Sequence, residues 1–268
     1  MWRWSGWLCC LCLVGCGGSV AESVPPHEYD QPLSEQQWEQ FREVLERVGP
    51  EEARSWGCVW APLPAWTADR TLSVSDLMAE EESKLAAVWQ PETWTSRWEK
   101  HPRIIAAMHA AGLTPEQFAG LWLAVHAAYG RSLTTPAELS SDWLRKTEQF
   151  CRLLAQDGRI VSTLSPDDFT RVQDLSLWLH RRDRLHRLQR VPADNVVLIQ
   201  RHRDWLQQYL PACAQESPLA TFSELLGEHG LPFIELPETG NDLHLPWDRH
   251  SALGRDTLKQ ETAGYPAR

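Results

Sequence analysis

The chain has 268 residues, and its 36 acidic side chains outnumber its 26 lysines and arginines, which gives a formal net charge of −10 at pH 7. An acidic chain of this kind excludes a general nucleic-acid binder and a protein held by charge on anionic lipid headgroups, because both surfaces are themselves negative. The length suffices for one large or two small domains with a hydrophobic core. Only Cys58, Cys151 and Cys213 lie beyond residue 16, so at most one disulfide can form among them and a disulfide scaffold is excluded.

The first segment of the chain has the features of a signal sequence. An apolar run over residues 7–14 follows a short start that carries one charged side chain, Arg3. Such a run suits the apolar core of a signal peptide and falls far short of the ~20 residues that a membrane-spanning helix needs. It ends in Leu13-Val14-Gly15-Cys16, which resembles the lipobox of bacterial lipoproteins.

The lipobox resemblance implies where the protein is held. In that family the cysteine receives a diacylglyceryl group, and cleavage before it would make lipidated Cys16 the first mature residue. Removing a signal peptide of residues 1–15 takes Arg3 with it, so the net charge goes from −10 to −11. The resemblance implies a periplasm-facing protein anchored in the bacterial cell envelope, and Gly17, where inner-membrane lipoproteins tend to carry Asp, favours the outer membrane. Cleavage by an ordinary signal peptidase and an uncleaved start remain the alternatives, because the short Trp-rich N-terminus is a weak signal.

The chain after the anchor is predicted to begin with a tether and a helix. Residues 16–32 are expected to form the lipidated cysteine and a flexible tether, because glycine, serine and proline are frequent there. Ser34 is then an N-cap and Gln37 its reciprocal capping-box partner, and the helix they open continues to Gly49-Pro50. Residues 50–75 show no clear period and are predicted to be an ordered loop.

The middle of the chain is predicted to contain the buried centre of the fold. Thr114, Pro115 and Gln117 combine an N-cap, a proline at the first helical position and a capping-box glutamine. The helix that they open is apolar on almost every face, so we expect it to be enclosed by other elements. The helices expected in this region cover residues 76–90, 92–100, 103–111 and 115–129.

The remaining segments complete an all-α prediction. Residues 231–268 are rich in proline, glycine and polar side chains and are expected to be a loop-rich tail, with a brief strand near 233–236. Long helices joined by short, proline-marked connections predict an irregular multi-helix bundle of about seven or eight helices, in a domain that spans residues 33–230. The later helices are expected over residues 136–156, 166–190, 194–210 and 217–228.

An arginine-rich stretch from His180 to Arg203 reverses the local sign of charge in this acidic chain. Guanidinium groups suit phosphate and carboxylate groups, so the stretch is a candidate site for lipid phosphates, acidic glycans or an acidic partner. The alternative is a solvated helix face, because Trp178 and the nearby leucines fall on one arc and would turn the arginines outward. The candidate anion-binding residues are Arg181, Arg182, Arg184 and Arg187.

A second candidate site lies near the C-terminus. Asp242, His244, Asp248 and His250 fall within nine residues, and imidazole with carboxylate is suitable chemistry for zinc or another transition metal. The alternative is a polar loop that carries such residues by chance, since no enzyme signature matches the segment. The metal stays open, and no cofactor is predicted.

His126 is the one strongly polar side chain beyond the first turn of the apolar helix of residues 115–129. A buried polar group without a partner costs about 1–3 kcal/mol. We therefore expect a core histidine bonded to a backbone carbonyl, and the alternative, with His109 nearby, is a ligand or a proton-transfer group.

Tryptophan is unusually frequent, with 12 of its 15 residues after Cys16. Those outside the expected core helices either cap the core with large apolar rings or bind sugars or a partner protein, and we favour the first interpretation. These residues are Trp56, Trp60, Trp66, Trp94 and Trp98.

Cys58 lies between two of these tryptophans. The context faintly resembles the cysteine-before-aromatic motif of papain-like proteases, but Val59 intervenes and a lone cysteine is weak evidence. A buried or paired cysteine is expected instead.

The chain lacks the sequence signatures of serine hydrolases, zinc proteases, phosphate-binding loops and dinucleotide-binding folds. Together with the lipobox, this pattern predicts a non-enzymatic envelope lipoprotein whose helical domain binds a protein partner or a cell-wall glycan. The alternative, from another class, is an envelope hydrolase or metal-dependent enzyme with its site near residues 242–250 or His126.

Overall fold

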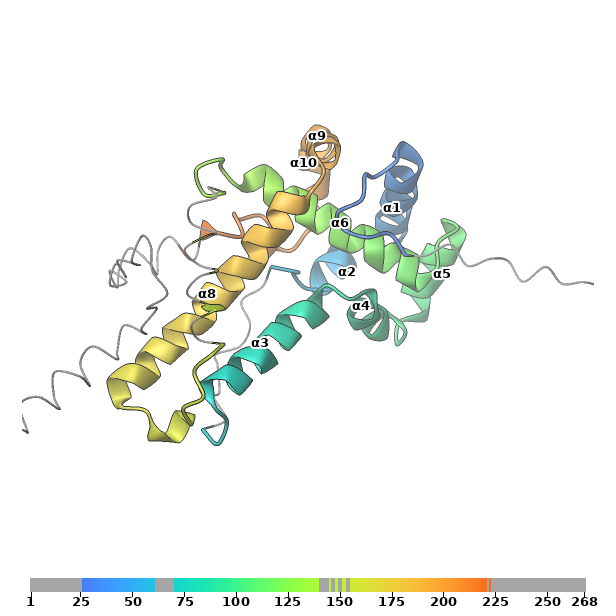
Figure 1. Cartoon of the computed structure of the whole chain (residues 1–268). Coiled ribbons are helices and arrows are strands. Elements are labelled where there is room, and N and C mark those ends of the chain that lie inside the picture. The colour runs from blue at the N-terminus through green and yellow to red at the C-terminus, as the bar shows by residue number, and fades with distance from the viewer. Residues whose placement is uncertain are drawn as a thin grey trace, which may run out of the picture.

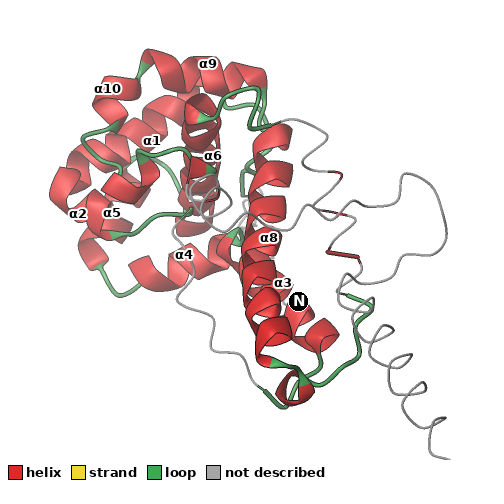
Figure 2. Cartoon of the chain, turned by 90° about the vertical axis from the view of Figure 1, so that its left-hand side faces the viewer, coloured by secondary structure: helices red, strands yellow, loops and turns green. Residues whose placement is uncertain are grey.

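The computed structural model describes residues 26–60, 70–139 and 155–220, together with residues 145, 148, 151, 152 and 222. Within these residues every regular element is a helix, which confirms the predicted all-α multi-helix bundle (Figure 2). The one β-type pairing in the described part is an isolated bridge between Ser73 and Ile160.

The described residues form nine α-helices and two short 3-10 helices. In chain order they are α1 (Glu35–Val48), α2 (Pro50–Ser55), α3 (Val74–Val88), α4 (Pro91–Trp98), α5 (Pro102–Ala110), α6 (Pro115–Leu133), η1 (Val161–Thr163), α8 (Pro166–Arg190), α9 (Ala193–Arg201), α10 (Arg203–Leu206) and η2 (Ala212–Ala214).

Both predicted capping boxes are present. The backbone N–H of Gln37 donates to Oγ of Ser34 at 3.2 Å, and the backbone N–H of Ser34 donates to Oε1 of Gln37 at 2.9 Å. Thr114 and Gln117 make the same two hydrogen bonds at 3.2 and 2.9 Å. These bonds satisfy amide groups that a helix start otherwise leaves without partners, so α1 and α6 begin where local chemistry dictates.

Two segments differ from the prediction. The expected loop of residues 50–75 begins with helix α2, because Gly49, with φ +93°, turns the chain and Pro50 opens a new helix at once. The expected helix of residues 194–210 is broken at His202, where α9 ends and the imidazole ring stacks on Trp38 at 4.7 Å. Three expected segments lie outside the described residues: most of the helix of residues 136–156, the last part (223–228) of the helix of residues 217–228, and the tail of residues 231–268.

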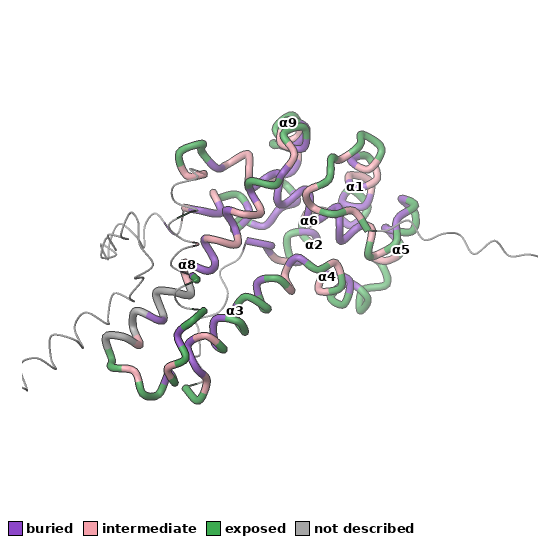
Figure 3. Tube along the Cα trace, viewed as in Figure 1, coloured by how far each residue is buried: buried purple, intermediate pink, exposed green. Residues whose placement is uncertain are grey.

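Helix α6 lies at the centre of the bundle, as predicted. All of residues 118–130 are buried, and α6 packs against α1, α4, α5, α8 and α9 (Figures 1 and 3). Its apolar character therefore reflects a core position. None of the helices in the described ranges is long and apolar enough to cross a membrane.

Aromatic rings fill the space around α6. Trp122 of α6 lies 5.1 Å from Trp56 and 6.2 Å from Trp94, measured between ring centroids, and Phe118 lies 5.2 Å from Trp98. Of the five tryptophans singled out in the sequence, Trp66 lies outside the described residues and the other four are buried, which confirms their structural role.

A second, smaller core lies between α3 and α8. The two helices run side by side and extend away from α1 and α5 (Figures 1 and 2). The side chains of this core come from both helices and from the segment before α8, and α8 also reaches the main core through Leu185 and Leu188. The fully buried members include Val74, Leu77, Met78, Cys151, Val161, Val172 and Leu179.

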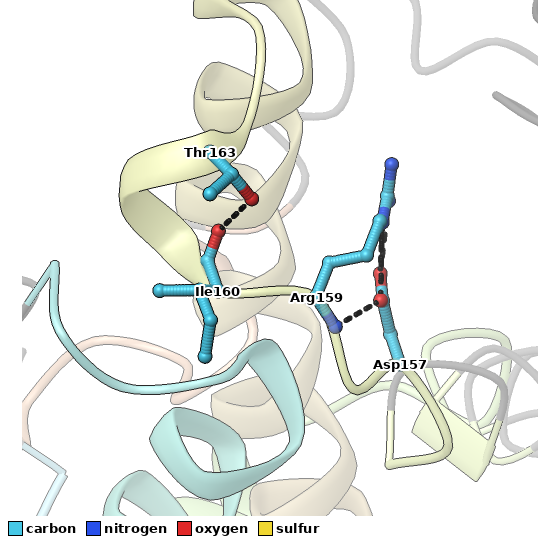
Figure 4. A network of polar contacts seen from close by, with 4 residues as sticks. All are labelled: Asp157, Arg159, Ile160 and Thr163. Atoms are coloured by element: carbon cyan, nitrogen blue, oxygen red, sulfur yellow. Dashed lines mark hydrogen bonds and ion pairs between the residues drawn. The ribbon is translucent and has the colours of Figure 1, made fainter.

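Residues 70–75 and 157–162 are joined by backbone hydrogen bonds beside the start of α3. The amides of Val74 and Ser75 donate to the carbonyl oxygens of Arg159 and Asp157, each at 2.9 Å. The buried Asp157 carboxylate accepts from the backbone and guanidinium of Arg159, next to a Thr163–Ile160 hydrogen bond (Figure 4). These contacts hold the segment before α8 against the segment before α3.

Residues 27–33 lie on the helical domain. The side chain of Asn195 accepts from the amide of Leu33 at 2.7 Å and donates to the carbonyl oxygen of Gln31 at 2.9 Å. Asp30 forms an ion pair with Arg190 at the end of α8. The chain expected to be a tether over residues 16–32 is therefore fixed to the domain from residue 27 onward.

Gly120 gives the first prediction. A Cβ at this position would lie 2.2 Å from the backbone oxygen of His27, so Gly120→Ala should push the N-terminal segment off α6. Overpacking of this kind destabilises a fold by about 1–3 kcal/mol. Urea unfolding should show that loss, and amide hydrogen exchange should become faster over residues 27–33. Gly158→Ala is the matched control, because nothing lies within 4 Å of its Cβ position. Unchanged exchange over residues 27–33 in Gly120→Ala would contradict the packing.

Candidate functional site

The arginine-rich half of α8 brings charged side chains into contact with the core. Arg181 and Arg184 are buried, with 6% and 8% of their surface exposed, whereas Arg182 and Arg187 are partly buried. The solvated-face interpretation is therefore wrong for Arg181 and Arg184. Their burial follows from the position of α8, which packs against α3 on one side and α6 on another.

Arg184 joins α8 to the segment that follows η2. Its Nη1 donates to the carbonyl oxygen of Pro218 at 2.7 Å, and its guanidinium carbon lies 5.0 Å from the ring centroid of Phe222. Burial lowers the pKa of Arg184 to about 10, so the group stays charged at neutral pH. A charged guanidinium in this environment depends on the carbonyl and the ring for the contacts that water would otherwise supply.

Two polar pairs connect α8 to α3. Nε2 of His180 donates to Oε1 of Glu81 at 3.0 Å, and both residues are buried. Arg182 pairs with Glu82 at 2.6 Å at the edge of the same contact. The hydrogen bond from His180 holds the pKa of Glu81 below its ordinary value of 4.5, against the opposing effect of burial. These pairs fix the register between the two helices.

Arg187 and Arg190 connect α8 to the N-terminal segment. Nε of Arg187 donates to both carboxylate oxygens of Asp183 at 2.9 Å, and its guanidinium carbon lies 4.6 Å from the ring centroid of Trp89 and 5.5 Å from that of Tyr29. Arg190 pairs with Asp30. A cation over an aromatic face contributes about 0.5–2 kcal/mol, so these contacts help to hold residues 29 and 30 in place.

The candidate anion-binding residues thus all have contacts inside the protein. The guanidinium carbon of Arg181 lies 5.8 Å from the ring of Trp178, and the other three have the contacts just described. An external phosphate or carboxylate would have to compete with those contacts. Anion binding by Arg181, Arg182, Arg184 and Arg187 stays a prediction, while the last three visibly join α8 to other parts of the chain.

His126 is a core histidine, as expected. Its ring is 1% exposed, and Nδ1 lies 2.9 Å from the carbonyl oxygen of Trp122. Nδ1 therefore carries the proton, and Nε2 is left as a buried acceptor that no described residue reaches. Burial lowers the pKa of His126 to about 4, so the ring is neutral at physiological pH. His109, in contrast, is exposed on α5.

The metal and lipidation candidates fall outside the described part of the chain. This holds for Cys16, Asp242, His244, Asp248 and His250. Among the residues that the structure does describe, no three or more His, Cys, Asp or Glu side chains gather closely enough to hold a metal ion.

Cys58 is buried, as the sequence suggested. Burial, with a smaller effect from the neighbouring Cys213 thiol, raises the pKa of Cys58 to about 12. A catalytic cysteine needs its thiolate form. The resting state of Cys58 is therefore unsuited to a protease nucleophile.

The low pKa of His126 gives a prediction for the pH dependence of stability. Between its ordinary value of 6.5 and about 4, the unfolded chain binds a proton that the folded chain does not. The free energy of unfolding should therefore fall as the pH drops through this window, and His126→Leu should reduce that slope by up to one proton. Urea unfolding followed by tryptophan fluorescence at pH 7.5 to 4 measures both slopes. His109→Leu is the control, and equal slopes in wild type and His126→Leu would contradict the prediction.

Glu81 gives the complementary prediction at lower pH. Its lowered pKa stabilises the fold above pH 4.5, and this contribution is lost as the pH falls through the folded-state pKa. At neutral pH, Glu81→Gln should lower the free energy of unfolding by about 1–3 kcal/mol, because His180 loses a charged acceptor. The difference from wild type should shrink below pH 4.5. Glu80→Gln, an exposed neighbour, should show a smaller effect, and an equal loss in both variants would argue against the buried pair.

Comparison of the chain with family models, with curated proteins and with solved structures finds no match. No activity, ligand or partner is therefore transferred from a relative. The proposals below rest on the N-terminal motif and on the contacts of the described residues.

Proposed function

We propose that this protein is a lipid-anchored protein of the bacterial cell envelope whose helical domain binds a protein partner or a cell-wall component without catalysing a reaction. The observation that carries the proposal is the sequence Leu13-Val14-Gly15-Cys16 at the end of a short apolar run. In this proposal Cys16 holds the membrane through its lipid, and no cofactor or nucleic acid takes part.

The contact of His27 with α6 supports a closely tethered domain. Residues 17–26 separate Cys16 from His27, whose backbone packs on α6. Ten residues span at most about 35 Å when fully extended. The helical domain would therefore work within a few nanometres of the membrane, where a partner in the same membrane or in the adjoining cell wall is within reach.

The internal contacts of the domain hold its helices together. The arginines of α8 and the tryptophans around α6 take part in packing, ion pairs and hydrogen bonds that join one helix to another. A domain built in this way presents a stable surface. The acidic net charge disfavours lying flat on anionic headgroups, which suits a domain held off the bilayer by its tether.

Lipidation of Cys16 is tested by mass spectrometry of the protein extracted from its own membranes. The expected mass is that of residues 16–268 plus a diacylglyceryl group and an acyl chain, and Cys16→Ser should lose the lipid and leave the membrane fraction. Cys12→Ser, in the same apolar run, should keep both. A wild-type protein without added lipid mass would contradict the anchor.

The binding role is tested with the same protein. Cosedimentation with purified peptidoglycan sacculi would identify a cell-wall component, and a discrete crosslinked product in intact cells that is lost in Cys16→Ser would identify a protein partner. Either result would contradict a chain that binds nothing in the envelope. Turnover of an envelope substrate by the pure protein would overturn the non-enzymatic part of the proposal.

A further inference from the structure

Two segments that are far apart in the sequence meet over Gly130 of α6. A Cβ at Gly130 would lie 2.7 Å from Cγ of Pro218 and 2.7 Å from Nε1 of Trp60, so these two side chains approach the same point of the helix. Nε1 of Trp60 also donates to the carbonyl oxygen of His126 at 3.1 Å, and η2 packs on α6. Trp60, two residues after Cys58, and Pro218, five residues after Cys213, are therefore neighbours on α6.

Each of these segments carries a free thiol. Cys58 is buried with 8% of its surface exposed, whereas Cys213, on η2, is exposed. The two thiols lie close enough to interact, and the guanidinium of Arg184 lies close enough to act on Cys58. The remaining cysteine beyond the N-terminal segment, Cys151, belongs to the second core between α3 and α8.

We propose that Cys58 and Cys213 are a redox-active dithiol that closes to an intramolecular disulfide, with an external disulfide as the oxidant. Cys213 is the attacking thiol because it is accessible, and Cys58 is the resolving thiol because it is enclosed. The pairing rests on the geometry of the two segments. In the cell, the supply of oxidant rests on the proposed envelope location, since disulfides persist in oxidising compartments.

The exchange proceeds in two steps that balance. The Cys213 thiolate attacks one sulfur of the oxidant R–S–S–R, forms a mixed disulfide and releases one R–S⁻, which takes up a proton. Cys58 then loses its proton and attacks Sγ of Cys213, which breaks the mixed disulfide and releases the second R–S⁻. Two protein thiols are oxidised to one disulfide, and the external disulfide is reduced to two thiols.

Arg184 is a positioning residue for the second step. Its guanidinium is held in place by the Pro218 carbonyl oxygen and lies near enough for its charge to act on Cys58. Burial raises the pKa of the resting Cys58 thiol, and the nearby positive charge acts in the opposite direction. Arg184 therefore favours the Cys58 thiolate when the mixed disulfide has formed next to it.

The test uses the full chain, oxidised glutathione as the probe, alkylation of remaining thiols under denaturing conditions, and tryptic peptide mapping. Wild type should yield a disulfide between the peptides of residues 55–70 and 204–249. Cys58→Ser should stop at a glutathione adduct on Cys213. Cys213→Ser should leave Cys58 unmodified, and Cys151, in the peptide of residues 147–152, should stay reduced in every variant.

The same time course tests Arg184. Arg184→Met should slow the conversion of the mixed disulfide and leave its formation unchanged, and Arg184→Lys should restore the conversion. A rise in the Cys58 pKa lowers its thiolate fraction, so Arg184→Met should lower the rate of the second step. Equal slowing of both steps would assign Arg184 a structural role alone.

Either of two results would overturn the dithiol. One is a wild-type chain that stops at the Cys213 adduct, and the other is a Cys213→Ser chain in which Cys58 reacts as fast as Cys213 does in wild type. Near-ultraviolet circular dichroism of each variant checks that it is folded, and Cys58→Ala repeats the trapping experiment with a second substitution. Because the oxidant is added in vitro, failure here is independent of the lipid mass measured on Cys16, so the two proposals fail separately.

Discussion

Helix α6 buries every residue from 118 to 130, so each of its faces has to be covered by another part of the chain. Helices α1, α4, α5, α8 and α9 cover most of that surface. Two glycines of α6 allow a close approach by chain outside the packed helices: the N-terminal segment lies over Gly120, and Trp60 and Pro218 meet over Gly130. The enclosure of α6 is therefore completed by segments between the helices as well as by the helices themselves.

Helix α8 follows from the same demand. At 25 residues it extends beyond α6, and α3 with the segment before α8 covers the part that would otherwise stand alone. Its charged side chains over residues 181–187 lie where the two cores meet, so they are partly or wholly buried. His180 and Arg182 reach α3, Arg184 reaches the segment after η2, and Arg187 reaches the N-terminal segment. Charge on this helix thus joins neighbouring parts of the fold.

Local chemistry was visible in the sequence, and long-range contacts were not. The capping boxes at Ser34 and Thr114 involve residues three apart, and the apolar character of α6 is a property of one helix, so both were predicted correctly. The burial of Arg181 and Arg184 was missed because the apolar side chains of this helix were assigned to one arc, as if the helix packed on one side only. In the structure, α8 packs on both α3 and α6.

The buried polar partners were also beyond reach of the sequence. Glu81 and His180 are about a hundred residues apart, and nothing in either local context distinguishes them from surface residues. Asn195 bonds to residues 31 and 33, so its role depends on where the chain start lies. The proximity of Cys58 and Cys213 likewise arises from two segments converging on α6. The lipobox, in contrast, is a purely local pattern, and the function proposed from it needs no tertiary contact.

The docking of residues 27–33 has a mechanical consequence for a chain anchored at Cys16. A pull on the anchor would reach the domain at His27 on α6, at the Asp30–Arg190 ion pair and at the two hydrogen bonds of Asn195. These contacts lie before the first turn of α1 and lead to three different helices. Load would therefore be distributed over three helices before it reached the first turn of α1.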